Sequence, residues 1–396
     1  MKKHSVRGFK FAARGAGIKK SGRMDLGLIY SEIPARCAAV FTTNKVAAAP
    51  VVLSRPRAAS GSIQAVLVNS GNANACTGEQ GLLDAKRCGE LTACALGIGE
   101  ELVIVASTGV IGHRLPMDRF ERHVPQLPAQ LSADGSDQLS EAIMTTDAFS
   151  KVSLAEGDCQ GKPYRILGLA KGAGMIHPDM ATMLAFVMTD AKVEAGFLDA
   201  ALRRAVAQSF NAITVDGDTS TNDMVLLLAN GMAETAEIVA ATPEAEAFQA
   251  RLDEVLLDLA KMIVRDGEGA TKLVRIQVEG AESDEDARLA ARAIATSSLV
   301  KTAFFGQDAN WGRIIAAAGY SGAQVDPALV DICFDRVPVV QAGLGTGREL
   351  EERATEVLKQ PEFSVIVDLG LGQGRAHYYT SDLTYDYVKI NADYRS

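Results

Sequence analysis

The sequence lacks both an excess of positive charge and long apolar runs, and these absences argue against several classes of protein. Its 396 residues contain 40 lysines and arginines against 49 aspartates and glutamates, a formal net charge of −9. Proteins that bind nucleic acids or anionic membranes generally present basic patches, so we expect neither partner. No stretch approaches the about 18 consecutive apolar residues that indicate a transmembrane helix.

Metal-binding and disulfide patterns are also missing. The six cysteines form no CxxC pair, and the five histidines form no HxxxH motif. In a chain of this length we expect reduced thiols that are mostly buried, no metal site and a cytoplasmic location. The basic start of the chain, residues 1–22, has no apolar segment of the kind that directs secretion, and we interpret it as part of the folded protein.

The common nucleotide-binding and serine hydrolase motifs, GxxxxGK[ST] and GxSxG, do not occur. Residues 368–374, DLGLGQG, superficially resemble a dinucleotide-binding loop, but such a loop must open a helix. The following residues, 375–390, are aromatic and β-branched and predict a strand. We therefore interpret these glycines as a hairpin or a bulge.

What the sequence does contain is the pattern of a mixed α/β protein. Its apolar fraction of 47% and charged fraction of 22% are ordinary for a globular chain. Short valine-rich runs predict buried strands, and apolar residues at helical spacing predict helices. We expect strands at 65–69, 102–106, 273–280 and 363–370, and helices at 79–96, 194–210, from 243 onward and after Ser283. A subdomain boundary is expected near residue 280, where a strand leads into a helix.

Polar, glycine-rich loops interrupt this scaffold. Any one of them could be an ordinary turn, because Gly, Asn and Asp are the usual turn residues. Six in one chain, each after a predicted strand or helix, indicate a common polar pocket. They are residues 69–78, 107–112, 145–147, 211–223, 265–272 and 306–313.

The segment KGAGMIHPDMATMLAF, residues 171–186, places glycines and a proline before a threonine and an apolar run. A threonine hydroxyl becomes an effective nucleophile beside a base, and the α-amine of an N-terminal threonine can be that base. If the hydroxyl of Thr182 attacked the carbonyl of Ala181, the chain would cut itself and create this amine. Gly172 and Gly174 would allow the distorted backbone that the step needs. From the residues alone, a glycine-rich turn with Thr182 at the start of a strand is the simpler alternative.

This segment resembles the cleavage site of the ornithine acetyltransferase family of arginine biosynthesis. The likeness covers nearly the whole chain and includes GFKFAARGAGIKKSGRMDLGLI, FTTNKVAAAPV, VLVNSGNANACTG, ASTGVIG, IMTTD, FNAITVDGDTSTND, IVRDGEGATK, SLVKTAFFGQDANWGR and YVKINADYRS. The resemblance implies a layered α-β-β-α sandwich of the self-cleaving aminopeptidase and ornithine acetyltransferase type, with a smaller C-terminal α/β domain from about 280 to 396. It also implies cleavage between Ala181 and Thr182 into chains 1–181 and 182–396, which stay together in an α2β2 heterotetramer.

The resemblance further implies roles for individual residues. Thr182 would be the nucleophile of both self-cleavage and catalysis, and Thr108 and Gly109 would form the oxyanion hole. The substrate-binding positions would be Thr145, Lys171, Thr182, Glu268, Asn391 and Ser396. Three positions differ from the common family residue, since Ala173 replaces a serine, Asp179 an asparagine and Ser396 a threonine. None of the three removes a group that the chemistry requires.

The implied reaction moves an acetyl group from N2-acetyl-L-ornithine to L-glutamate by a ping-pong scheme through acetyl-Thr182. No cofactor is expected, and the residues leave open whether acetyl-CoA is a second donor. As hypotheses, Glu268 would bind the substrate ammonium and Lys171 would balance a carboxylate or the oxyanion. Two alternatives remain: a self-cleaving aminopeptidase or amidase, which passes the acyl group to water, and a non-catalytic amino-acid-binding protein.

Overall fold

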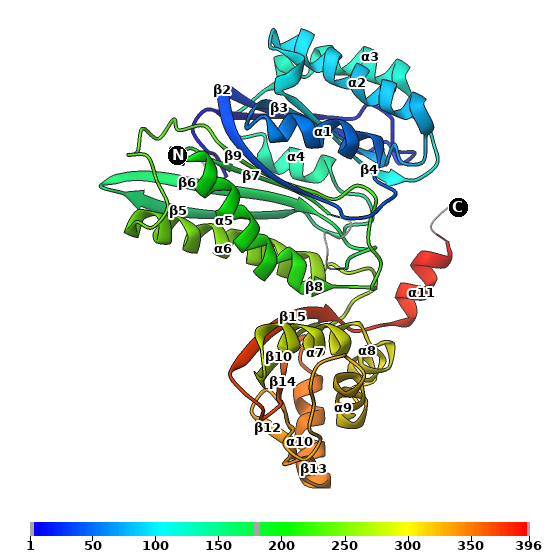
Figure 1. Ribbon diagram of the computed structural model, residues 1–396. Coiled ribbons are helices and arrows are strands. Elements are labelled where there is room, and N and C mark those ends of the chain that lie inside the picture. The colour runs from blue at the N-terminus through cyan, green and yellow to red at the C-terminus, as the bar shows by residue number, and fades with distance from the viewer. Residues whose placement is uncertain (1–3, 178–182, 394–396) are drawn as a thin grey trace. The chain divides into compact units, whose positions relative to one another are not determined.

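The computed structural model describes residues 4–177 and 183–393, in two compact units (Figure 1). The larger unit comprises Met1–Met175, Asp179–Asn211 and Asp218–Ile263, and the smaller comprises Ile176–Pro178, Ala212–Gly217 and Val264–Ser396. Each unit has its own β-sheet and its own helices. The predicted α/β class with a smaller C-terminal α/β unit is therefore confirmed.

The sheet of the larger unit runs, within the described residues, in the order β4-β3-β2-β9-β7-β6-β5, and β1 pairs with β2. Its strands are β1 (Phe9–Arg14), β2 (Leu26–Phe41), β3 (Ser62–Asn72), β4 (Val103–Val110), β5 (Lys151–Cys159), β6 (Lys162–Lys171), β7 (Leu184–Thr189) and β9 (Met224–Ala229). Strands β7 and β9 are parallel and buried along their whole length, because LAFVMT and MVLLLA are continuous apolar runs. Strand β1 lies within the basic start of the chain, which is thus part of the fold.

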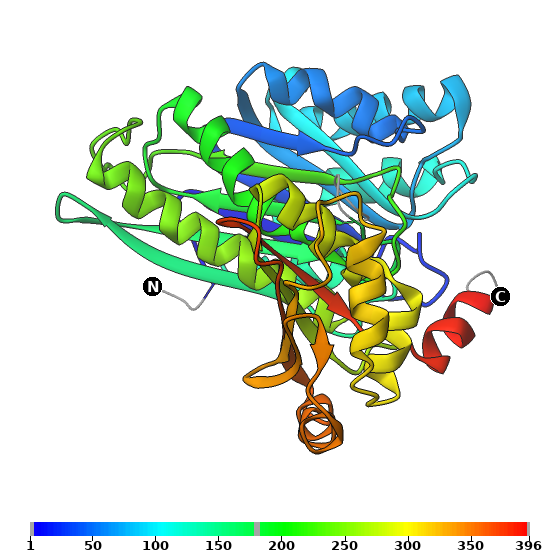
Figure 2. The ribbon, with the colours of Figure 1, turned by 60° about the horizontal axis from the view of Figure 1, so that its bottom comes forward.

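The helices of the larger unit are α1 (Ala49–Ala59), α2 (Gly78–Leu96), α3 (Met117–His123), α4 (Ser136–Ala142), α5 (Ala195–Gln208) and most of α6 (Pro243–Arg265). Helix α6 begins as predicted, with Pro243 in its first turn and the hydroxyl of Thr242 accepting a hydrogen bond from the N–H of Ala245. It packs on β6 at Gly168, where a Cβ atom would lie only 2.6 Å from the side chain of Leu259. Figure 2 shows α6 running along the strands.

The sheet of the smaller unit has the order β13-β12-β11-β14-β10-β15-β8 within the described residues. Its strands are β8 (Ile213–Thr214), β10 (Leu273–Ala281), β11 (Asp331–Phe334), β12 (Val337–Gln341), β13 (Leu344–Gly345), β14 (Glu362–Asp368) and β15 (Gly374–Ser381). The helices are α7 (Asp284–Thr296), α8 (Ser298–Phe305), α9 (Trp311–Gly319), α10 (Arg348–Leu358) and α11 (Tyr385–Ala392). The predicted boundary near residue 280 falls at the end of β10, and β10 itself belongs to the sheet of the smaller unit.

Two predictions for the C-terminal region are wrong. The strand predicted over 375–390 ends at Ser381, and helix α11 follows, because the hydroxyl of Thr384 caps it by accepting a hydrogen bond from the N–H of Tyr387. For the glycines of 368–374 the hairpin alternative is wrong, since β10 lies between β14 and β15, whereas the bulge alternative has a counterpart in the register shift of the β10–β15 pair where Ala281 faces Gly374. These glycines carry the chain across the end of β10, and a Cβ atom at Gly374 would lie 2.2 Å from the backbone of Ser283.

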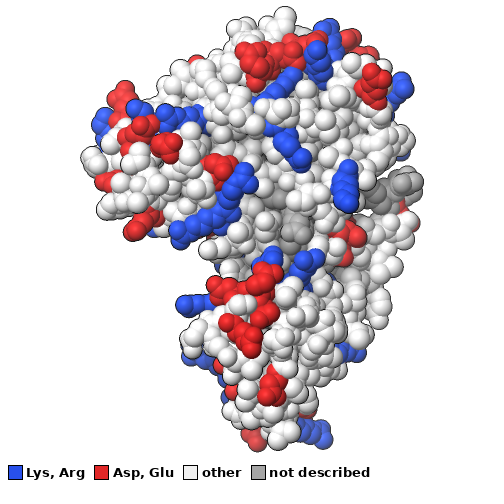
Figure 3. Space-filling model, viewed as in Figure 1, with Lys and Arg blue, Asp and Glu red and all other residues white. Residues whose placement is uncertain are grey.

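The cysteines and the surface add two further findings. All six cysteines are free in the structure, but only Cys88 and Cys159 are fully buried, so the expectation of mostly buried thiols is wrong. On the face drawn in Figure 3, positive and negative side chains are interspersed in small groups. Among the described residues, no helix is both long and apolar enough to cross a membrane.

Candidate active site

In the sequence, the predicted cleavage point falls in the segment that connects two paired strands of the larger sheet. Strand β6 ends at Lys171 and β7 begins at Leu184, and these two residues are register partners. Ala181 and Thr182 lie outside the described residues. Met183, the residue bonded to Thr182, donates its N–H to Oδ1 of Asp223 at 2.8 Å, and its carbonyl accepts a hydrogen bond from the N–H of Met224. The backbone directly after Thr182 is therefore fixed at the start of β9.

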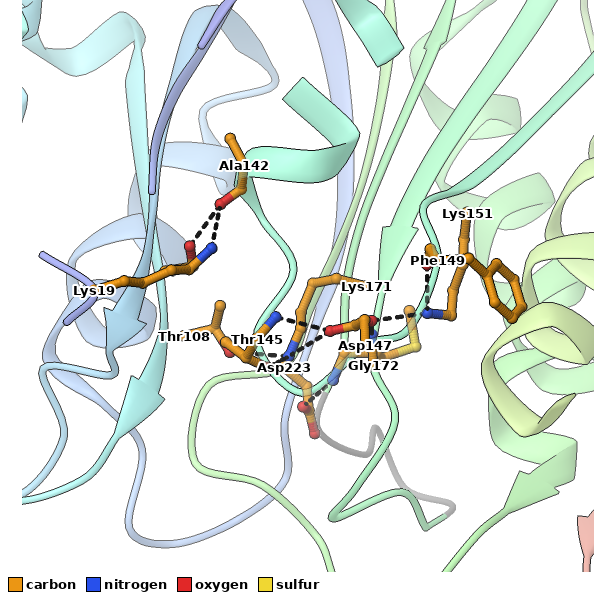
Figure 4. Close-up of polar contacts among 12 residues, drawn as sticks. Lys19, Thr108, Ala142, Thr145, Asp147, Phe149, Lys151, Lys171, Gly172 and Asp223 are labelled. Carbon is orange, nitrogen blue, oxygen red and sulfur yellow. Dashed lines mark hydrogen bonds and ion pairs between the residues drawn. The ribbon is translucent and has the colours of Figure 1, made fainter. Parts of the chain in front are cut away.

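Three of the predicted site residues meet at the ammonium group of Lys171 (Figure 4). The Nζ atom of Lys171 donates hydrogen bonds to Oγ1 of Thr145 at 2.8 Å and to Oγ1 of Thr108 at 3.2 Å. Thr108 is on β4, Thr145 follows α4 and Lys171 ends β6, so each comes from a different part of the larger unit. The structure thus brings Thr108, a predicted oxyanion position, together with the predicted substrate-binding positions Thr145 and Lys171, while their roles stay predictions.

Three of the six polar loops predicted to form a common pocket are linked by hydrogen bonds from one side chain. The amide nitrogen of Asn222 donates to the carbonyls of Ala73 and Ser107, at 2.7 and 2.8 Å. This one side chain therefore joins three loops, those of residues 69–78, 107–112 and 211–223. Gly109 has a φ of 135°, and a Cβ atom there would lie 2.3 Å from the backbone of Gly71, so only glycine fits the predicted oxyanion position.

Asp147, the last residue of the TTD loop, is a charged group that the sequence did not single out. Its side chain has no exposed area, and it forms a salt bridge to Lys151 with a distance of 2.8 Å from Oδ1 to Nζ. Burial alone would raise the pKa of Asp147, but the ammonium groups of Lys171 and Lys151 outweigh burial and hold this pKa well below its ordinary value. Asp147 is therefore an ionised carboxylate beside the candidate site.

Asp223, the acceptor for the N–H of Met183, has a pKa that is shifted in the opposite direction from that of Asp147. It is fully buried, and burial raises its pKa well above the ordinary value of a carboxyl group, although the hydrogen bond from Met183 and the charge of Lys171 act in the other direction. The sequence indicated this residue only as part of the DGDTSTND motif. Its position directly after Asn222 and directly before an apolar strand was the available signal.

A pocket of about 620 Å³ opens beside Thr145, with Lys19, Arg23, Met144 and Phe149 in its wall. The Nζ atom of Lys19 donates to the carbonyl of Met24 at 2.8 Å, and burial lowers the pKa of Lys19 to about 8. Figure 4 shows Lys19 beside Ala142, whose carbonyl is its second acceptor. The pocket is of the size that holds small-molecule ligands.

The other two described substrate-binding positions lie in the smaller unit. The amide nitrogen of Asn391, on α11, donates to Oε2 of Glu268 at 2.9 Å. Helix α11 is held against the 265–272 loop, because the hydroxyl of Thr384 donates to the carbonyl of Gly269 at 2.8 Å. The contact between Asn391 and Glu268 joins two predicted substrate-binding positions within the smaller unit, and their role stays a prediction. Ser396 lies outside the described residues.

The residues just before the cleavage point are held in the smaller unit, which the sequence did not indicate. The N–H of Ile176 donates to Oδ1 of Asp216 at 2.8 Å, and its carbonyl accepts from the N–H of Val215. A ring nitrogen of His177 lies 3.2 Å from the guanidinium of Arg292. Across residues 4–177 and 183–393, no group of three or more His, Cys, Asp or Glu side chains is arranged to hold a metal ion.

Comparisons with known proteins identify the family of the chain. The ArgJ family model matches residues 10–396. The arginine biosynthesis bifunctional protein ArgJ of Syntrophotalea carbinolica is 67% identical over 392 residues, which cover 99% of each chain, and that of Geobacter sulfurreducens is 57% identical over 99% of this chain and 100% of its own. A crystal structure of ArgJ from Bacillus halodurans is 47% identical and covers 52% of this chain and 97% of its own, with a TM-score of 0.51. The chain belongs to the ArgJ family.

Proposed function

We propose that this chain is a glutamate N-acetyltransferase of arginine biosynthesis, which moves the acetyl group of N2-acetyl-L-ornithine to L-glutamate. The observation that carries the proposal is the cluster of Lys171, Thr108 and Thr145, placed at the end of the strand that leads to Thr182. Membership of the ArgJ family supports it, because the relatives described above are named as bifunctional proteins of arginine biosynthesis.

The first half of the reaction would take place at Thr182, after cleavage behind Ala181 has freed its α-amine. This amine accepts the hydroxyl proton while the oxygen attacks the acetyl carbonyl of N2-acetyl-L-ornithine. Donors at Thr108 and Gly109, with the ammonium of Lys171, stabilise the negative charge on the carbonyl oxygen. The intermediate then breaks its C–N bond, the α-amine passes the proton to the leaving nitrogen, and ornithine departs from acetyl-Thr182.

The second half would repeat these steps with glutamate as the nucleophile. The amine of glutamate attacks the acetyl ester, and its proton passes through the α-amine to Oγ1 of Thr182, which leaves as the hydroxyl. N-acetyl-L-glutamate is released and the enzyme is restored. Glu268 would bind a substrate ammonium group, with its carboxylate oriented by the hydrogen bond from Asn391. Ser396 would complete the substrate contacts.

The remaining features of the proposal concern the state of the mature protein. It would consist of chains 1–181 and 182–396 in an α2β2 heterotetramer, in the cytoplasm, without a resident cofactor. Acetyl-CoA would be a second acetyl donor, as the word bifunctional in the relatives' names suggests.

A donor and acceptor assay tests the proposal. The purified protein is incubated with N2-acetyl-L-ornithine, with and without glutamate, and ornithine, acetate and N-acetyl-L-glutamate are quantified, with Thr182→Ala as the inactive control. We expect ornithine and N-acetyl-L-glutamate in equal amounts, and turnover only when glutamate is present. Steady release of acetate without glutamate would instead establish an aminopeptidase or amidase, and no release at all would favour a binding protein. The same assay with acetyl-CoA as donor tests the second activity.

A further inference from the structure

Three charged side chains are buried together beside the candidate active site. The side chains of Asp147 and Lys151 have no exposed area, and that of Lys171 is 3% exposed. Removing such groups from water is costly, and apolar residues of similar size are often at least as stabilising in their place. Stability alone therefore does not explain a buried cluster of one carboxylate and two ammonium groups. We look for its role in the groups that it holds in place.

Asp147 contacts both sides of the cluster through its two oxygens. Oδ1 accepts hydrogen bonds from Nζ of Lys151 at 2.8 Å and from the N–H of Gly172 at 2.7 Å. Oδ2 accepts the N–H of Thr145 at 2.9 Å and lies 3.9 Å from Nζ of Lys171. The carboxylate thus fixes the backbone of Thr145 and the backbone just after Lys171, the two residues whose side chains bind each other.

The contact with Lys171 differs from the contact with Lys151. At 3.9 Å, Asp147 and Lys171 form an ion pair whose separation exceeds hydrogen-bonding distance, and the N–H groups of Lys171 are directed at the hydroxyls of Thr145 and Thr108. Lys151 makes the close hydrogen bond instead. Two cations on one carboxylate keep Asp147 ionised even when the charge of Lys171 is engaged elsewhere, and the depressed pKa of Asp147 agrees with this.

We propose that Asp147, supported by Lys151, is a positioning residue for acetyl transfer that keeps Lys171 charged and directed at Thr108 and Thr145. This rests on the proposed function. Lys171 then meets the developing oxyanion or the substrate carboxylate with its ammonium already oriented, which is the preorganisation that electrostatic catalysis requires. Among the described residues, Lys19 and the buried Asp223 also interact electrostatically with Lys171.

Asp147→Asn and the double substitution Asp147→Asn with Lys151→Met separate positioning from packing. In Asp147→Asn, we expect kcat to fall by about 10–100-fold, as a displaced catalytic group typically costs. The basic limb of the pH profile should move to lower pH, because the ammonium of Lys171 has lost its counter-charge. The double variant removes the uncompensated charge of Lys151, so its melting temperature should recover, whereas kcat and the shifted pH profile should not.

Asp190→Asn is the matched control. Asp190 is also a buried carboxylate that accepts backbone N–H groups, from Arg165 at 2.7 Å and from Arg7 at 3.4 Å. It lies at the opposite end of the β6–β7 pair from Lys171, so its substitution should leave the pH profile unchanged.

All rates are expressed per cleaved chain, measured by intact mass. Recovery of kcat together with stability in the double variant, or a wild-type rate and pH profile in Asp147→Asn, would overturn the inference. An inactive wild-type protein would refute the proposed function instead.

Discussion

The buried carboxyl group of Asp223 yields a prediction that can be worked through from the structure. Replacing Asp223 with alanine removes the acceptor for the N–H of Met183, and this N–H is left buried without its partner. A buried donor that loses its hydrogen bond destabilises the fold by about 1–3 kcal/mol. At about 2–4 °C per kcal/mol for a unit of this size, the melting temperature should fall by about 2–12 °C.

Asparagine at position 223 should behave differently, because its carbonyl oxygen can still accept the N–H of Met183. The pKa of Asp223 is raised in the folded protein, so its stabilising contribution is complete below the unfolded pKa of about 3.9. That contribution is lost as pH rises toward the folded pKa, where the buried carboxyl must ionise. Relative to the unsubstituted protein, Asp223→Asn should therefore gain stability as pH increases, and Asp223→Ala should be the less stable variant at pH 5.

Thermal unfolding of both variants in a Thr182→Ala background, followed from pH 4 to pH 8, measures these differences in a single uncut chain. In the cleavable chain, Asp223→Ala should slow self-cleavage more than Asp223→Asn. The reason is that the hydrogen bond of Met183 fixes the backbone next to the nucleophile. Equal melting temperatures for Asp223→Ala and Asp223→Asn across this range would refute the role given to the hydrogen bond with Met183.

Two further substitutions test the glycine at the oxyanion position and the cap of the C-terminal helix. Gly109→Ala should lower both melting temperature and activity, because its Cβ atom would lie 2.3 Å from neighbouring backbone, whereas Gly112→Ala, which also has a positive φ but open space around it, should cost much less. Similar melting temperatures for the two would contradict this reasoning. Thr384→Ala should destabilise α11 by about 1 kcal/mol, because the helix loses its cap. It should also raise KM for N2-acetyl-L-ornithine, because Asn391 lies on this helix and contacts Glu268. The same cap removal at Ser283 on α7 should leave KM unchanged, and a KM that responds equally to both changes would argue against a role for α11 at the site.

The helices and strands that local patterns predicted have counterparts in the structure, except for the strand over 375–390, which ends at Ser381. Helix α5 runs along its predicted stripe, and α2 ends at Gly97, which adopts a left-handed conformation with φ of 69°. Helix α11 was missed, because YDYVKINA is rich in residues that favour strands and its stability comes from the cap and from its contact with the Gly269 loop. The order of β14, β10 and β15 was missed since strand pairing between distant segments leaves no local signal.

The candidate site was also predicted only in part from the sequence. Motifs carried the resemblance that indicated Thr108, Thr145 and Lys171, and the structure brings these three together. Asp147 and Asp223 gained importance only through burial and through their partners, which neither composition nor spacing reports. The i, i+4 spacing of Asp147 and Lys151 was visible in the sequence, but in a loop it has no fixed geometric meaning.

The central claim is that the chain cuts itself before Thr182 and uses the new N-terminus as its base. Intact mass spectrometry of the purified, denatured protein tests this most directly. The account predicts two chains, one from the start of the sequence to Ala181 and one that begins at Thr182, with cleavage abolished by Thr182→Ala. A single uncut chain after prolonged incubation would contradict the account, because an internal threonine has no α-amine to accept its proton.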